Sequence, residues 1–158
     1  MSAIAVRSLY PRLVYSRSAV VRALRTLDRN RPVLKRPRCP AAIVGELSVA
    51  FLTDAALAEL HADHLGDPSP TDVITFPGDA TLGSAGEICV SVDAARRLGE
   101  ARGADWSREL SLYLVHGWLH LAGHADDEPG ARRAMRRAEA RALDILERES
   151  ALPSFGFR

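Results

Sequence analysis

The stretch RELSLYLVHGWLHLAGHADD, residues 108–127, decides the interpretation of this chain. Residues 108–122 predict a helix that Ser107 can cap. The helix ends at Gly123, because a glycine enters the left-handed backbone conformation without steric cost. His116 and His120 lie four residues apart on this helix, so that they share one face with their Cβ atoms about 5–6 Å apart. Both imidazole rings can therefore reach one metal ion.

The third ligand of such an ion has two candidates, His124 and Asp126. On a continuous helix His124 would lie about 12 Å along the axis from His116, too far for one ion to bridge. A turn at Gly123 instead brings back a residue a few positions further on, and the spacing H-x-x-x-H-x-x-G-x-x-[H/D] is that of metal sites with a glycine turn. The spacing favours Asp126. It predicts one Zn²⁺ ion held by His116, His120 and Asp126, with the open fourth position that marks catalytic zinc.

A structural interpretation of the same residues stays open, with two partly buried histidines on an amphipathic helix and Asp126 and Asp127 capping the next one. A zinc hydrolase of peptides or small molecules is a further alternative. It is weakened by Gly117, because zinc peptidases carry a Glu directly after the first His as general base. A glycine inside a helix costs about 1 kcal/mol relative to alanine, so we expect it to have a use. Leaving room above the metal for a bulky substrate is one.

The bulk composition is that of an ordinary globular protein. The 158 residues are 47% hydrophobic and 26% charged, which favours one domain spanning residues 1–158. No apolar run approaches the roughly 20 residues of a membrane span. Cys39 and Cys89 form no CxxC motif and no signal-peptide pattern opens the chain. Free thiols in the cytoplasm are therefore expected, with a disulfide between the two as the alternative.

The first 40 residues are strongly basic, with Asp28 as their one acid. Their ten cations are Arg7, Arg12, Arg17, Arg22, Arg25, Arg29, Arg31, Lys35, Arg36 and Arg38. This imbalance favours contact with a polyanion such as nucleic acid. A solvated helix face and a transit peptide are the alternatives.

Periodicity and turn residues predict the elements of one α/β (α+β) domain. The expected strands are residues 3–9, 45–52, 71–77 and 86–91, and the expected helices are 18–28, 54–65, 93–102, 107–122 and 128–149. Residues 29–40, 66–70 and 78–86 are expected to be loops, and the tail 150–158 to be loose. Strands and helices alternate along the chain, which indicates a mixed sheet of about four strands packed with about five helices, with the metal site at the end of a helix.

With these motifs in place, the chain resembles the YbeY family of metal-dependent endoribonucleases, which act as rRNA maturation factors. HGWLHLAGHAD (116–126) is similar to the family pattern HGxLHLxGxxH. SPTDVITFPGD (69–79) is similar to PTDVLSFP, and GEICVS (86–91) to GDIVIS. Met135 and Glu139 lie where the family has a helix with a Met and a Glu.

The resemblance covers roughly residues 44–147, and two positions depart from it. The third ligand, usually His in the family, is Asp126 here, and carboxylate is an accepted zinc ligand. The Arg that usually precedes the Gly before PTDV is Leu65. Arg108, or one of the arginines between 132 and 137, can supply the missing cation.

The resemblance implies a single-strand-specific, zinc-dependent endoribonuclease that processes the 3′ end of small-subunit rRNA and takes part in ribosome quality control. The implied partners are rRNA and the ribosomal small subunit, and no membrane partner is implied. His116, His120 and Asp126 would act through the bound metal, and Thr71, Asp72 and Arg108 are candidates to line the substrate cleft. A role for Asp72 in stabilising the fold stays open. The alternative that the protein is a ribosome assembly factor without catalytic activity also stays open.

Overall fold

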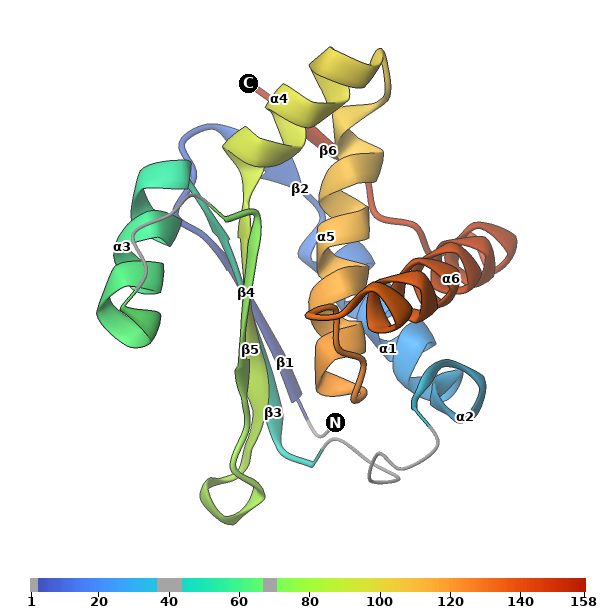
Figure 1. The fold of residues 1–158 in the computed structure, drawn as a ribbon. Coiled ribbons are helices and arrows are strands. Elements are labelled where there is room, and N and C mark those ends of the chain that lie inside the picture. The colour runs from blue at the N-terminus through green and yellow to red at the C-terminus, as the bar shows by residue number, and fades with distance from the viewer. Residues whose placement is uncertain (1–2, 37–43, 67–70) are drawn as a thin grey trace.

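The computed structural model describes residues 3–36, 44–66 and 71–158, and its centre is a four-stranded mixed sheet (Figure 1). The strands are β1 (Ala3–Ser8), β3 (Glu46–Leu52), β4 (Val73–Pro77) and β5 (Ser84–Ser91). They lie in the order β1-β3-β5-β4. β1, β3 and β5 run parallel and β4 runs antiparallel to β5. The predicted mixed sheet of four strands is confirmed.

Helices cover both faces of this sheet, because successive residues of a buried strand point to opposite faces. α3 (Asp54–Leu65) packs on one face, where Leu57 meets Ile74 and Cys89. The larger core on the other face includes Ile88 and Val90 of β5. It is covered by α1 (Arg17–Arg29), α5 (Trp106–Leu121) and α6 (Pro129–Arg148), with α4 (Val92–Arg102) at one end of the sheet.

Gly117 is a point of very close approach between α5 and the sheet. A Cβ atom at this position would lie 2.5 Å from Cγ2 of Ile88 on β5, closer than real side chains approach. Gly117 thus allows the helix to lie close to the sheet. The expectation that it leaves room for a substrate above the metal is wrong, because Gly117 faces the buried core.

The expected loose tail is also wrong. β6 (Phe155–Phe157) pairs antiparallel with β2 (Leu13–Tyr15) in a second, two-stranded sheet. Phe155 is only 8% exposed and lies edge-on to Phe51, with ring centroids 5.3 Å apart. Phe157 stacks on Trp106 at 4.7 Å. Local sequence gives no sign of this anchoring, because the partner strand and aromatic rings come from distant parts of the chain.

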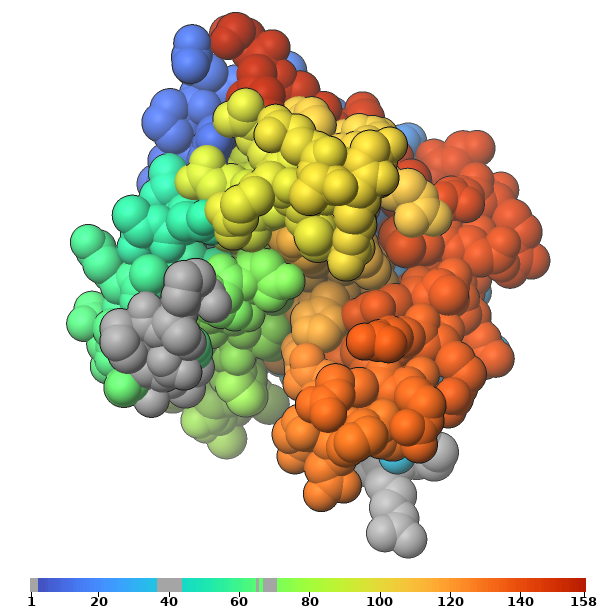
Figure 2. Space-filling view, turned by 45° about the horizontal axis from the view of Figure 1, so that its top comes forward, coloured from blue at the N-terminus to red at the C-terminus, as the bar shows by residue number. Residues whose placement is uncertain are grey.

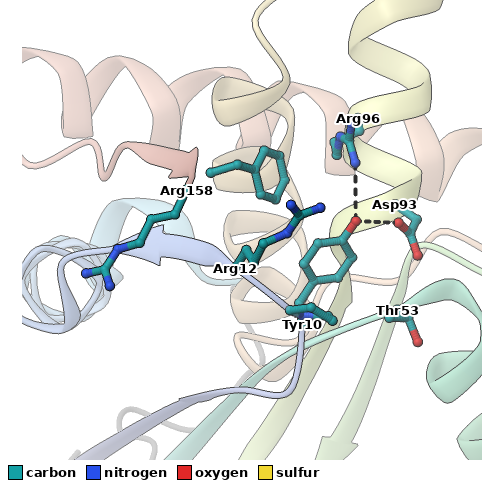
Figure 3. A pocket seen from close by; sticks show the side chains of 8 residues that line it. Tyr10, Arg12, Thr53, Asp93, Arg96 and Arg158 are labelled. Carbon is teal, nitrogen blue, oxygen red and sulfur yellow. Dashed lines mark hydrogen bonds between the residues drawn. The ribbon is translucent and has the colours of Figure 1, made fainter.

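The same end of the molecule holds a polar pocket of about 350 Å³ (Figure 3). Tyr10 donates a hydrogen bond to Asp93 (2.7 Å) and accepts one from Arg96 (3.4 Å), which ties the β1–β2 connection to α4. Arg158 extends away from this group in the view of Figure 3. The pocket therefore marks where the β1–β2 connection, α4 and the tail meet.

The remaining elements follow the predicted boundaries closely, with three local differences. Residues 31–34, expected to be a loop, form the short helix α2 (Arg31–Leu34), which begins with a proline in its first turn. α5 is capped by Asp105, and the hydroxyl of Ser107 accepts a hydrogen bond from the backbone of Phe155 instead. A 3₁₀ turn, η1 (Ala80–Leu82), lies in the predicted loop before β5.

No helix in the described ranges has the length and apolar character to cross a bilayer. Cys89 is buried in β5, and burial is the main cause that raises the pKa of its thiol to about 12. Cys39 lies outside the described residues, so its free thiol stays a prediction.

Candidate metal centre

The C-terminal end of α5 turns sharply at Gly123. This residue has a φ of 91°, which glycine adopts freely. The amide of Gly123 donates to the carbonyl of His120 (3.0 Å), and the amide of His124 donates to that of Leu119 (3.0 Å). These bonds satisfy carbonyls that the helix end leaves open. The turn directs the following residues back toward α5, as the position of Gly123 predicts.

The structure brings together the side chains of His116, His120 and Asp126. The Nε2 atoms of the two histidines are 2.9 Å apart. Oδ2 of Asp126 lies 3.4 Å from Nε2 of His116 and 3.7 Å from Nε2 of His120. Ligand atoms at 2.0–2.1 Å from a tetrahedral Zn²⁺ ion would be separated by about 3.4 Å. The three residues therefore fit one ion of this size, and all their ligand atoms lie within 4.8 Å of one another.

Hydrogen bonds at the far side of each ring decide which nitrogen faces the centre. Nδ1 of His116 lies 2.7 Å from a carboxylate oxygen of Glu139, and Nδ1 of His120 lies 3.0 Å from the carbonyl oxygen of His124. Both partners accept, so both Nδ1 atoms carry the proton when the rings are neutral. The two Nε2 atoms then present lone pairs to each other and to Asp126. Two imidazole nitrogens and a carboxylate oxygen that face one another without a proton between them are the ligand set of a metal site.

The electrostatic surroundings of the two histidines differ. Burial by itself lowers the pKa of His116, but the hydrogen bond and charge of Glu139, together with the charges of Asp126 and Asp72, raise it overall. Burial and the neighbouring His116 lower the pKa of His120. Negative charge thus gathers around His116, which favours a cation at the centre.

The predicted cleft residues Thr71 and Asp72 are neighbours in the chain, and the charge of Asp72 reaches His116 of this centre. With Arg97 and Tyr113 they line a pocket of about 420 Å³. Tyr113 lies one helical turn before His116, and its pKa is raised to about 12, mainly by burial and then by the charge of Asp72. Figure 2 shows the surface hollowed between β4 and the segment that joins α5 to α6. The backbone carbonyl of Asp72 accepts from the amide of Ser91 (2.8 Å). Any residue at position 72 could make this bond, so the structural role left open for the Asp72 side chain stays a prediction.

Arg108, the third cleft candidate, does not join this group. Its guanidinium donates to Glu147 of α6 at 2.9 and 3.3 Å. It also lies eight residues before His116, about 12 Å along the helix axis. Arg132 is nearer, since it donates to the backbone carbonyls of Asp126 (3.3 Å) and Asp127 (3.2 Å).

Two further positions, Trp118 and Leu65, lie outside this group. Trp118 is fully buried, and the guanidinium of Arg31 lies 5.7 Å from its ring centroid. Its ring is therefore part of the core. Leu65, where the resembling family has Arg, is the last residue of α3.

Glu139 is the residue at the candidate centre to which the sequence alone assigned no role. It is one turn beyond Met135, which is buried in the core, and its carboxylate reaches His116 from α6. The available signal was the family resemblance of the Met135–Glu139 pair. Spacing along the chain could not predict the pairing of Glu139 with His116, because 23 residues and a turn separate the two.

Fold and geometry together define an α/β protein with a candidate mononuclear metal centre of two histidines and a carboxylate. The family model described as endoribonuclease YbeY matches residues 19–147. The chain belongs to the endoribonuclease YbeY family.

Individual relatives agree with this assignment. The endoribonuclease YbeY of Chlamydia abortus is 38% identical over 125 residues, which cover 74% of this chain and 79% of the relative. That of Chlamydia pneumoniae is 41% identical over 115 residues, covering 68% and 73%. The solution structure of a Thermotoga maritima protein shares the fold, with a TM-score of 0.57 over 94% of each chain at 17% identity.

Proposed function

We propose that this protein is a zinc-dependent endoribonuclease that cleaves single-stranded RNA in the maturation of small-subunit rRNA, and that it takes part in ribosome quality control. The observation that carries the proposal is the convergence of His116, His120 and Asp126, with both Nδ1 atoms engaged elsewhere. Membership of the endoribonuclease YbeY family supports RNA as the substrate. The proposed location is the cytoplasm, with the ribosomal small subunit as partner.

Each residue near the centre has a defined part in this proposal. His116, His120 and Asp126 would hold one Zn²⁺ ion, which when bound lowers the pKa of a water molecule and polarises a phosphate oxygen. Glu139 holds the ring of His116 so that its Nε2 faces the centre. Thr71 and Asp72 line the pocket beside the centre, where the RNA strand would lie.

A zinc hydrolase of peptides is the weaker alternative. Gly117 has no carboxylate, and it packs against Ile88 instead of facing the metal centre. The general base that zinc peptidases place at this position is therefore missing. An assembly factor without catalysis is the other alternative, and the double variant His116→Ala with His120→Ala tests it by complementation of rRNA processing.

The test compares wild type with Asp126→Ala, and uses Asp127→Ala as the matched control. We expect wild type and Asp127→Ala to contain nearly stoichiometric zinc and to cleave a single-stranded RNA but not a fluorogenic peptide. We expect Asp126→Ala to lose most of its zinc and its cleavage, because two histidines alone leave the ion with half of a tetrahedral set. Elemental analysis and a gel-based cleavage assay measure both quantities. Zinc-free wild-type protein, or equal cleavage by all three proteins, would contradict the proposal.

A further inference from the structure

A second site lies beside the metal centre, where the end of α2 meets α6 (Figure 1). It is a pocket of about 230 Å³ whose charged lining consists of Lys35, Arg36, Arg137 and Arg141. No carboxylate is among the described residues that line it. Four like charges around one small cavity repel one another, so the pocket is electrostatically suited to an anion.

The walls of this pocket are held in place by three hydrogen bonds. Nε2 of His124 donates to the carbonyl of Leu34 (2.7 Å), and the amide of Arg36 donates to that of Ala122 (3.1 Å). The guanidinium of Arg141 donates to the carbonyl of Val33 (3.2 Å). The bonds fix the end of α2 against both α6 and the turn after α5. The cations are therefore brought together by the fold and are not simply scattered over its surface.

Two of the four cations are available to a ligand. Arg36 and Arg137 are exposed, and their side chains make no hydrogen bond or ion pair within the described parts of the chain. A guanidinium presents its N–H groups as a planar fork that matches the oxygens of a phosphate. Two alanines of α6, Ala134 and Ala138, line the pocket between the cations and leave space for such a group.

The pocket and the metal centre share structural elements. His124 lines the pocket with its side chain, while its carbonyl accepts the hydrogen bond that orients His120. Both sites also use α6, since Arg137 lies two residues before Glu139, whose carboxylate orients His116 from another face of the helix. A strand cut at the centre would thus have the pocket close to its path.

We propose that this pocket binds a backbone phosphate of the single-stranded RNA substrate and so positions the strand relative to the metal centre. The inference rests on the proposed endoribonuclease function and adds to it a phosphate subsite built from Arg36 and Arg137. The small volume suits one phosphate group. The site brings together cations of residues 35–36 and cations of α6. No local sequence pattern connects these two segments.

The experiment measures binding of a labelled single-stranded RNA by fluorescence anisotropy at several salt concentrations, with a gel showing that the RNA stays intact. The test variant is Arg36→Gln with Arg137→Gln. The control, Arg22→Gln with Arg25→Gln, removes the same charge from exposed positions on α1. We expect the test variant to bind at least tenfold more weakly, with a salt slope smaller by about 0.7 for each phosphate that it no longer neutralises. The control should change less than twofold. Unaltered zinc content and thermal midpoint show that both variants fold.

Equal binding by the test variant and wild type, or an equal loss in the control, would overturn the proposal. So would an absence of RNA binding in wild type. Inorganic phosphate serves as a second probe: a variant that loses phosphate binding but keeps RNA binding would show a site for free anions only, against the proposal. Because binding is measured apart from cleavage, a wild-type protein that binds RNA through these arginines without cutting it would contradict only the proposed function.

Discussion

At the scale of single residues, the metal centre depends on how each histidine uses its two ring nitrogens. Nδ1 of His116 is engaged by Glu139, and Nδ1 of His120 by the carbonyl of His124. One partner is a side chain from α6 and the other is the backbone of the turn after α5. The orientation of His116 can therefore be changed by substitution, whereas that of His120 is set by the backbone.

The substitution Glu139→Gln tests this orientation. An amide binds the Nδ1–H group more weakly than a carboxylate and removes a negative charge near the metal, so we expect zinc affinity to fall about 10–100-fold. A competition titration with a chelator dye measures this affinity.

The control is Glu147→Gln, which changes an exposed carboxylate of the same helix. Its zinc affinity should equal that of wild type. An unchanged affinity in Glu139→Gln would show that this carboxylate plays no part in orienting His116.

At the scale of elements, α5 has to satisfy two surfaces at once. Its buried side packs on β5 at Gly117, and the histidines on either side of that glycine in sequence face the metal centre. The distance between the helix and the sheet sets how deeply the metal centre is buried. A side chain at position 117 would push the two apart.

The substitution Gly117→Ala therefore should destabilise the protein although alanine favours helices. The new Cβ would lie 2.5 Å from a methyl carbon of Ile88, which is buried and β-branched and cannot easily move. Overpacking of this kind costs about 1–3 kcal/mol, which outweighs the gain in helix propensity of about 1 kcal/mol. Denaturant unfolding measures the free energy.

Gly130→Ala in α6 is the matched comparison, because the nearest atom to its new Cβ is 3.9 Å away on a flexible arginine. It should be neutral or slightly stabilising. A Gly117→Ala protein as stable as Gly130→Ala would mean that the helix and sheet adjust without cost.

At the scale of the whole molecule, the tail completes the fold. β6 pairs with β2, and Phe155 fills the space next to Phe51 and Tyr15. The C-terminal tail thus packs against residues 13–15 and against the core. Removal of this packing should affect stability much more than its terminal position suggests.

The substitution Phe155→Ala should lower the free energy of unfolding by about 3–5 kcal/mol, the usual cost of removing a buried aromatic ring. Thermal and denaturant unfolding measure it. Leu82→Ala is the control, since Leu82 is 81% exposed, and it should stay near wild type. Equal stability of the two variants would contradict the structural role of the tail.

Local sequence determined the elements whose signals are themselves local. Thr53 caps α3 and Gly66 ends it in the left-handed conformation, so the predicted bounds of this helix agree with the structure. The glycine turn likewise predicted that Asp126, and not His124, approaches the two histidines. These signals act over a few residues, and backbone geometry alone relates them to structure.

The tertiary structure decided the features that join distant segments. The pairing of β6 with β2, the reach of Glu139 to His116 and the basic pocket between α2 and α6 each unite residues far apart in the chain. Such contacts depend on how helices and strands pack, which periodicity and spacing do not specify. The sequence by itself thus determined the four central strands, the long helices and the three candidate ligands, while packing decided where the tail pairs, how the ligands are oriented and what lies beside them.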